Sequence, residues 1–122
     1  MPPRNENAAA HLPLSAAVLH VLLALADEER HGYGIMLEIE RRTQGSFRPG
    51  SGTLYGTIQR LLASRLIEES GERPDPQLDD ARRRYYRLTA LGRRVLEAEV
   101  KRLQQLVGVA RIKNLLPRSV TP

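Results

Sequence analysis

The chain has 122 residues, enough for one domain with a single small core, so a catalytic cleft between two domains is not expected. Nineteen Lys and Arg against fourteen Asp and Glu leave a net charge of +5, which favours a polyanionic partner such as nucleic acid. The absence of Cys excludes disulfides, thiolate nucleophiles and Cys-based zinc sites.

The first residues predict neither export nor membrane insertion. Residues 1–11 mix Pro, Asn and Ala without an apolar face, so we expect a flexible N-terminal arm rather than a signal peptide. The longest apolar stretch, residues 16–26, is interrupted by His20 and falls well short of the ~20 residues of a membrane span. We therefore expect a cytoplasmic protein with no membrane partner.

Two helices are predicted in the first half of the chain. The first begins near Leu14, because apolar residues then recur at the spacing of one helical face: Leu14, Val18, Val21, Leu22 and Leu25. The second covers residues 32–43, directs Ile35, Met36 and Ile39 inward, and is capped at its end by Gly45.

A third helix is predicted from Ser51, whose hydroxyl is placed to cap its first turn. The 3.6-residue period directs one set of apolar side chains inward, namely Leu54, Ile58, Leu61 and Leu62. The opposite face is slim and polar, with Gly52, Tyr55, Gly56, Gln59 and Arg60. Each interior glycine costs a helix about 1 kcal/mol relative to Ala, and close approach of the backbone to a large partner would account for that cost.

A hairpin follows the third helix. Residues 67–70 and 84–88 are predicted strands, joined by a loop over residues 71–83 that is rich in Pro, Asp and Gly. Strand alternation places Tyr86 and Leu88 toward the core, and Arg83, Tyr85 and Arg87 on the other side.

The last predicted helix starts after Thr89 and carries an apolar seam in alternating steps of four and three: Leu96, Val100, Leu103, Val107 and Ala110. A domain of this size has no further element to cover that seam. We therefore expect the chain to dimerise with a second copy of itself.

These elements predict a mainly α fold with a small β-hairpin, a winged helix-turn-helix followed by a C-terminal dimerisation helix. The expected boundaries are a flexible arm over residues 1–11, a DNA-binding domain over 12–88, the dimerisation helix over 89–116 and a flexible tail over 117–122.

The third helix and the hairpin together provide what recognition of double-stranded DNA requires. A slim helix fits the major groove, where Thr53, Tyr55, Gln59 and Arg60 could reach base edges. Cations beside the groove contact phosphates, and the hairpin supplies Arg82, Arg83, Arg84 and Arg87.

The sequence shows no arrangement of residues that is typical of a catalytic site. Neighbouring carboxylates such as Glu68 and Glu69 do not form an acid and base pair across a pocket, and there is no glycine-rich phosphate loop or nucleophile elbow. The three histidines are not at metal-ligand spacing. We expect neither an enzyme nor a cofactor or metal site.

Three ordered motifs resemble the PadR family of transcriptional regulators: HGYGI at residues 31–35, PGSGTLYGTIQRLLASRLIEES at 49–70 and RRRYYRLTALG at 82–92. The resemblance covers residues 12–110. It implies a winged-helix homodimer that represses transcription. It places DNA-binding positions at Tyr33, at Ser51, Gly52, Thr53, Leu54 and Tyr55, and at the hairpin arginines.

The single terminal helix resembles the short branch of this family, which dimerises through that helix and can hold flat apolar or aromatic ligands between subunits. Some short members use tryptophans for this purpose, whereas this chain has no Trp and a single Phe, Phe47. A small-molecule effector is therefore expected from the resemblance, but not by tryptophan stacking.

Other interpretations stay open. The third helix could be an ordinary surface helix, and the arginine cluster a solvated strand end balanced by Asp79 and Asp80. A winged-helix scaffold could bind a partner protein instead of DNA. A DNA-binding chain of this kind could also be an activator or an architectural protein.

Overall fold

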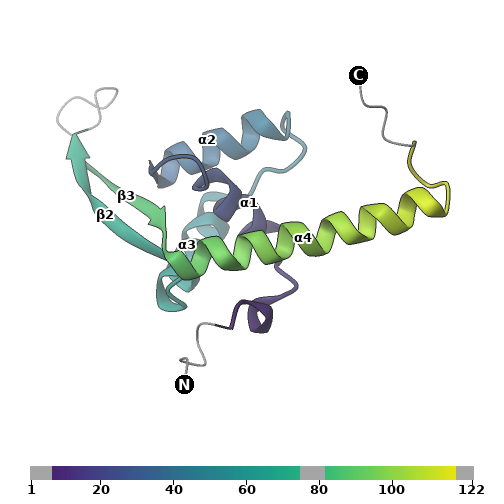
Figure 1. Ribbon diagram of the computed structural model, residues 1–122. Coiled ribbons are helices and arrows are strands. Elements are labelled where there is room, and N and C mark those ends of the chain that lie inside the picture. Colours follow the sequence, from purple (N-terminus) through teal and green to yellow (C-terminus); the bar gives the residue numbers. More distant parts are fainter. Residues whose placement is uncertain (1–6, 75–81, 118–122) are drawn as a thin grey trace.

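The computed structural model describes residues 7–74 and 82–117, and within them the chain is mainly helical with a small antiparallel sheet (Figure 1). Its elements are η2 (Ala8–His11), α1 (Ala16–Ala24), β1 (Arg30–His31), α2 (Gly32–Arg42), α3 (Ser51–Ala63), β2 (Ile67–Pro74), β3 (Arg82–Leu88) and α4 (Ala90–Ile112). The predicted fold class is confirmed.

Helices α1, α2 and α3 pack around one core through the apolar residues that the helical period selected. The buried side chains include Val21, Leu22, Leu25, Ile35, Ile39, Ile58 and Leu61. Ser15 begins α1, because its hydroxyl accepts from the Val18 N–H at 3.2 Å. Helix α2 ends at Arg42 and Thr43 is its C-cap, so the predicted cap Gly45 comes two residues later, with φ at +78° and its N–H donating to the Glu40 carbonyl at 2.9 Å.

The sheet has the order β1-β3-β2, and both pairings are antiparallel. Strands β2 and β3 extend further into the predicted loop than expected, while the remainder of that loop, residues 75–81, lies outside the described residues. Tyr86 is buried, as its place in the alternation predicted. Strand β1 was not predicted, because two residues are too few to show an alternating pattern.

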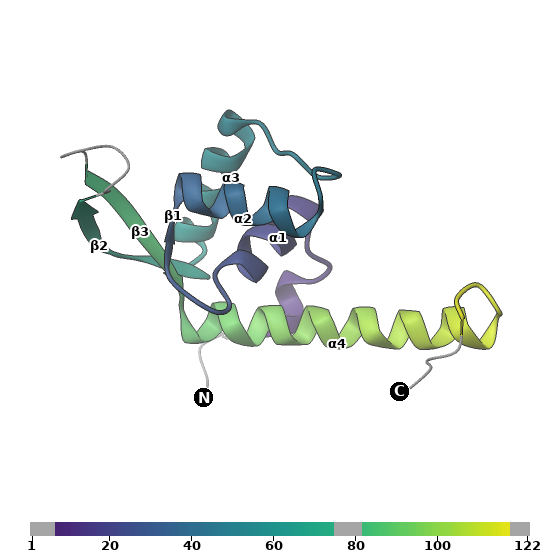
Figure 2. The same ribbon diagram turned by 90° about the horizontal axis from the view of Figure 1, so that it is seen from above.

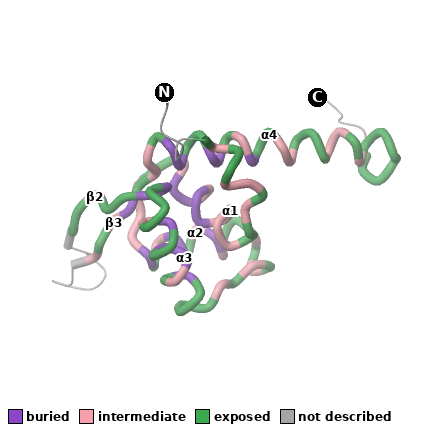
Figure 3. Tube along the Cα trace, turned by 90° about the horizontal axis from the view of Figure 1, so that it is seen from below, coloured by how far each residue is buried: buried purple, intermediate pink, exposed green. Residues whose placement is uncertain are grey.

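Helix α4 starts at the end of the hairpin, where the Thr89 hydroxyl accepts from the Gly92 N–H at 2.9 Å. Figure 2 shows α4 along one side of the molecule with α3 on the opposite side. The buried residues of α4 all lie between Leu91 and Glu99. The rest of the helix extends past the domain and carries no buried residue (Figure 3). The helix ends at Ile112 rather than at residue 116 as expected.

The segment before α1 differs from the loose arm that we expected. Residues 1–6 lie outside the described residues, but Ala8–His11 form a turn of 3-10 helix that contacts α4, and Ala8 packs against the core. The buried Glu99 carboxylate fixes the same segment, since it accepts from the Leu14 N–H at 2.8 Å. Arg102 donates to both oxygens of Glu99, which lowers the pKa of that carboxyl below its usual value.

Candidate nucleic-acid interface

The first turn of α3 presents three exposed small residues, Ser51, Gly52 and Thr53. Ser51 was predicted to cap this helix, and that prediction is wrong. Gly50 is the cap residue, and no side chain of the described residues caps the first turn. The leading N–H groups of α3 are therefore left for water or an anionic partner, toward which the positive end of the helix dipole points.

Leu54, which the resemblance placed among DNA-binding positions, is only 2% exposed and belongs to the core. The helical period had predicted this, because Leu54 shares a face with Ile58 and Leu61. Its side chain therefore anchors α3 to the domain and does not reach a ligand.

Tyr55 stands on the flank of α3 that borders α2, and its side chain is 48% exposed. Its ring lies so close to Gly32 that a Cβ added at Gly32 would stand 3.2 Å from the ring and from the phenolic oxygen. Because Gly32 has no side chain, the Tyr55 ring of α3 can lie against the start of α2.

Tyr33, the second residue of α2, is 41% exposed and meets the hairpin through its ring. The guanidinium carbon of Arg83 lies 5.2 Å from the centre of that ring, within the range of a cation–π contact. Residues from α2, α3 and β3 are thereby brought to one region of the surface.

The arginines of β3 differ in their surroundings. The Arg84 guanidinium lies 3.4 Å from a Glu69 oxygen, and Arg87 donates to Glu68 at 2.7 Å. Acidic partners reduce the positive charge that these two residues can offer to a phosphate. The backbone of Arg82 pairs with Pro74 at the far end of the described hairpin, and its side chain lies outside the described residues.

Gln59 and Arg60 are exposed on the last turns of α3, as predicted. The Arg60 guanidinium donates to the Thr57 hydroxyl at 3.2 Å. Arg60 also borders a hollow of about 250 Å³ with residues that precede or begin α1, among them His11 and Leu14. Arg60 is therefore on the flank of α3 that faces α1, whereas Tyr55 is on the flank that faces α2.

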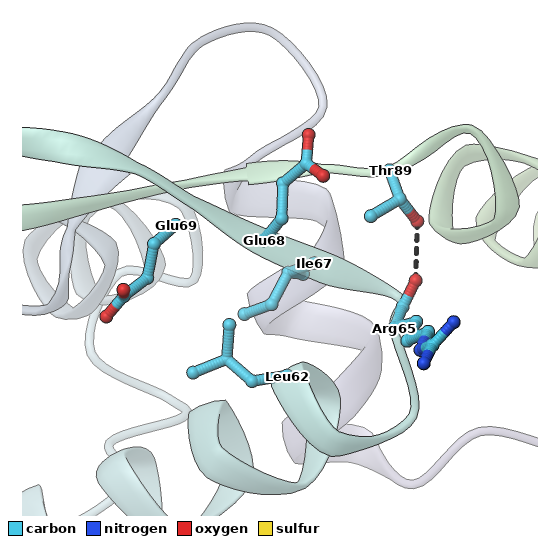
Figure 4. A pocket seen from close by; sticks show the side chains of 6 residues that line it. All are labelled: Leu62, Arg65, Ile67, Glu68, Glu69 and Thr89. Atoms are coloured by element: carbon cyan, nitrogen blue, oxygen red, sulfur yellow. Dashed lines mark hydrogen bonds between the residues drawn. The ribbon is translucent and has the colours of Figure 1, made fainter.

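A second hollow, of about 510 Å³, lies at the base of the hairpin between α3 and β2 (Figure 4). Leu62 and Ile67 contribute its apolar surface, and the Thr89 hydroxyl donates to the Arg65 carbonyl at 2.7 Å beside it. Arg65, Glu68 and Glu69 also line it, so charges of both signs border this hollow.

The predicted dimerisation seam is divided between the core and the surface. Leu96 is 5% exposed and packs in the core of its own domain, so it was wrongly assigned to a surface for a second copy. From Val100 onward the apolar residues of α4 are exposed or half-buried, including Leu103, Val107 and Ala110 from the prediction and Leu106 and Val109, which the heptad spacing missed.

Sequence reasoning missed the roles of the half-buried His31 and the buried Gly32, which support this surface from below. His31 caps α2, because its Nδ1 accepts from the Gly34 N–H at 2.9 Å, and His20 stacks on Phe47 at 4.5 Å between ring centres. The described residues contain no group of three or more potential metal ligands.

None of the helices described in residues 7–74 and 82–117 combines the length and the apolar character of a membrane span.

Comparison with known proteins gives the family. The profile described as "Transcriptional regulator PadR-like family" matches residues 19–98. A transcriptional regulator of Mycobacterium tuberculosis is 37% identical over 92 residues, which cover 75% of this chain and 79% of that protein.

Solved structures show the same fold. A PadR family transcription regulator from Clostridium difficile superposes with a TM-score of 0.65 and 24% identity over 80% of this chain and 96% of that chain. Bacillus subtilis PadR, solved in complex with operator DNA, superposes with a TM-score of 0.59 and 15% identity. That comparison covers 90% of this chain but 52% of the Bacillus protein.

Proposed function

Because the chain belongs to the PadR-like family of transcriptional regulators, we propose that it regulates transcription by binding double-stranded DNA through α3, the start of α2 and the β2–β3 hairpin. The family consists of regulators, which confirms the prediction that the chain is not an enzyme. A regulator of this kind acts in the cytoplasm, beside the DNA.

The observation that carries this proposal is that Arg83 of β3 lies over the Tyr33 ring, while Tyr55 of α3 borders Gly32, the neighbour of Tyr33 in α2. The exposed first turn of α3 has no side-chain cap. In the proposed complex the α3 side chains read bases in the major groove, namely Ser51, Thr53, Tyr55, Gln59 and Arg60. Tyr33, Arg82, Arg83 and Arg84 contact the phosphates.

We propose that the working form is a homodimer joined through the part of α4 that extends past the domain. This part carries apolar residues on one broad side, and Val100 and Leu106 are 47% and 53% exposed. A helix that leaves its own domain can bury such a surface against a second copy. The two α3 helices would then enter successive major grooves about 34–36 Å apart, so the operator would be an imperfect palindrome.

We further propose that the dimer is a repressor that a small apolar or aromatic ligand releases. The apolar side of α4 offers such a ligand dispersion contacts between two copies. The chain has no Trp, so aliphatic side chains would make most of those contacts.

Selection of bound fragments from a genomic duplex pool tests the proposed function. We expect enrichment of fragments that share an inverted repeat with half-site centres about 10–10.5 base pairs apart. A set of fragments without a common sequence would count against a sequence-specific regulator.

A matched pair of variants separates base reading from phosphate contact. Arg60→Ala is expected to reduce binding to the selected site more than binding to random duplex, whereas Arg83→Ala weakens both. Equal losses on both duplexes for Arg60→Ala would remove Arg60 from the base-reading set.

A further inference from the structure

His31 lies at the point where the hairpin sheet joins the helices. Its backbone is in β1, opposite Tyr85 of β3, and its side chain is the N-cap of α2. The imidazole ring lies edge-on to the Tyr85 ring at 5.2 Å between centres, and nearly parallel to the Tyr33 ring at 6.5 Å with 11° between the planes. One side chain therefore contacts both the hairpin and the start of α2.

The two glycines that alternate with His31 and Tyr33 make this arrangement fit. A Cβ at Gly34 would stand 3.3 Å from the His31 ring, and a Cβ at Gly32 would stand 3.2 Å from the Tyr55 ring. Both distances are tighter than nine in ten real Cβ contacts. In the string HGYG, His31 supplies the ring that caps α2, and Tyr33 supplies an exposed ring. Gly32 leaves space for the Tyr55 ring, and Gly34 leaves space for the His31 ring.

We infer that His31 is a positioning residue for DNA binding, which fixes Tyr33 beneath Arg83 by joining the N-terminus of α2 to β3. This inference rests on the proposed function. In this arrangement the ring of Tyr33 holds the Arg83 guanidinium 5.2 Å above its centre. When the His31 ring is lost, Tyr33 and the hairpin can move apart, and Arg83 is no longer directed to its phosphate.

Substitution by Asn separates the two roles of His31. Asn is a good N-cap, so His31→Asn keeps an acceptor for the Gly34 N–H but removes the ring. We expect His31→Asn to unfold at the temperature of the parent protein and His31→Ala to unfold earlier. Affinity of His31→Asn for duplex DNA should fall about tenfold, the loss of one hydrogen bond to a charged group. The slope of log affinity against log salt should become shallower by about 0.9, the loss of one phosphate contact.

A double-mutant cycle with Arg83 completes the test. If His31 acts by directing Arg83, the variant with both His31→Asn and Arg83→Ala binds no more weakly than Arg83→Ala alone. Losses that add, or a His31→Asn protein with the affinity and salt slope of the parent, would overturn the inference. So would a His31→Asn protein that unfolds as early as His31→Ala, because the effect on DNA would then follow from stability.

Failure of the proposed function is distinguishable from failure of this inference. In the first case the parent protein itself binds no duplex at low salt, and the positioning role falls with it. In the second case the parent protein binds and only the His31 variants depart from expectation.

Discussion

Replacement of Gly92 by Ala tests how the domain is joined to α4. Gly92 lies in the first turn of α4, against Leu66 in the turn between α3 and β2. A Cβ at this position would stand 1.9 Å from the Leu66 carbonyl oxygen, a backbone atom that cannot rotate away. That carbonyl also accepts from the Thr89 N–H at 3.1 Å, while the Thr89 hydroxyl, which donates to the Arg65 carbonyl at 2.7 Å, lies 3.2 Å from it.

The expected cost follows from these contacts. Relief of the clash has to separate the two segments by about 1 Å, and overpacking of this kind costs about 1–3 kcal/mol. The same movement weakens the bond from the Thr89 N–H, which is worth about 1 kcal/mol. Ala gains about 1 kcal/mol over Gly in a helix, which offsets only part of the loss. We expect Gly92→Ala to lower the free energy of unfolding by about 1–3 kcal/mol.

Gly108 provides the matched control, because the same substitution on the same helix meets nothing within 4 Å. Gly108→Ala should raise the free energy of unfolding by about 1 kcal/mol. Urea denaturation of both variants, at one protein concentration since an oligomer's stability depends on it, gives the two differences. Shifts of the same sign would refute the described contact between Gly92 and Leu66.

Arg83→Ala should make the salt slope of duplex binding shallower by about 0.9, the loss of one phosphate contact, and an unchanged slope in binding titrations would contradict that assignment. Glu99→Gln should lower the free energy of unfolding at neutral pH by about 1 kcal/mol, because a neutral acceptor replaces a charged one. The pKa of Glu99 is lowered in the folded state, so its stabilising effect is present above the ordinary carboxyl pKa and is lost as pH falls through the folded value. Denaturation from neutral to acidic pH should therefore show the two proteins converging, and a constant difference would exclude this linkage. Leu106→Glu should yield a monomer in light-scattering measurements, and an unchanged mass would count against dimerisation through α4.

The apolar period of the sequence predicted the helices and their inward faces closely. The period was also correct at Leu54, which the resemblance placed among the DNA-binding positions. The period placed Leu54 inward, and Leu54 is buried. Ser51 has a typical capping side chain, yet Gly50 took that position, because the sequence does not show at which residue a helix begins.

The sequence could not show which parts of α4 the domain covers. The spacing of four and three continues without a break from Leu96 to Ala110, although Leu96 is in the core and Val100 is exposed. The contact between Tyr33 and Arg83 was also beyond prediction, because the two residues are distant in the sequence and β1, which aligns them, has only two residues.

The most direct test of DNA binding through phosphate contacts is the affinity of the purified protein for duplex DNA as a function of salt. We predict that the protein binds duplex DNA at low ionic strength and that log affinity falls linearly with log salt. Each phosphate contact contributes about −0.9 to this slope, and we expect a slope steeper than a single contact would give. If the protein bound no duplex at low ionic strength, or bound with an affinity independent of salt, it would not be the DNA-binding regulator proposed for it. The first result would favour a winged-helix module that binds another protein.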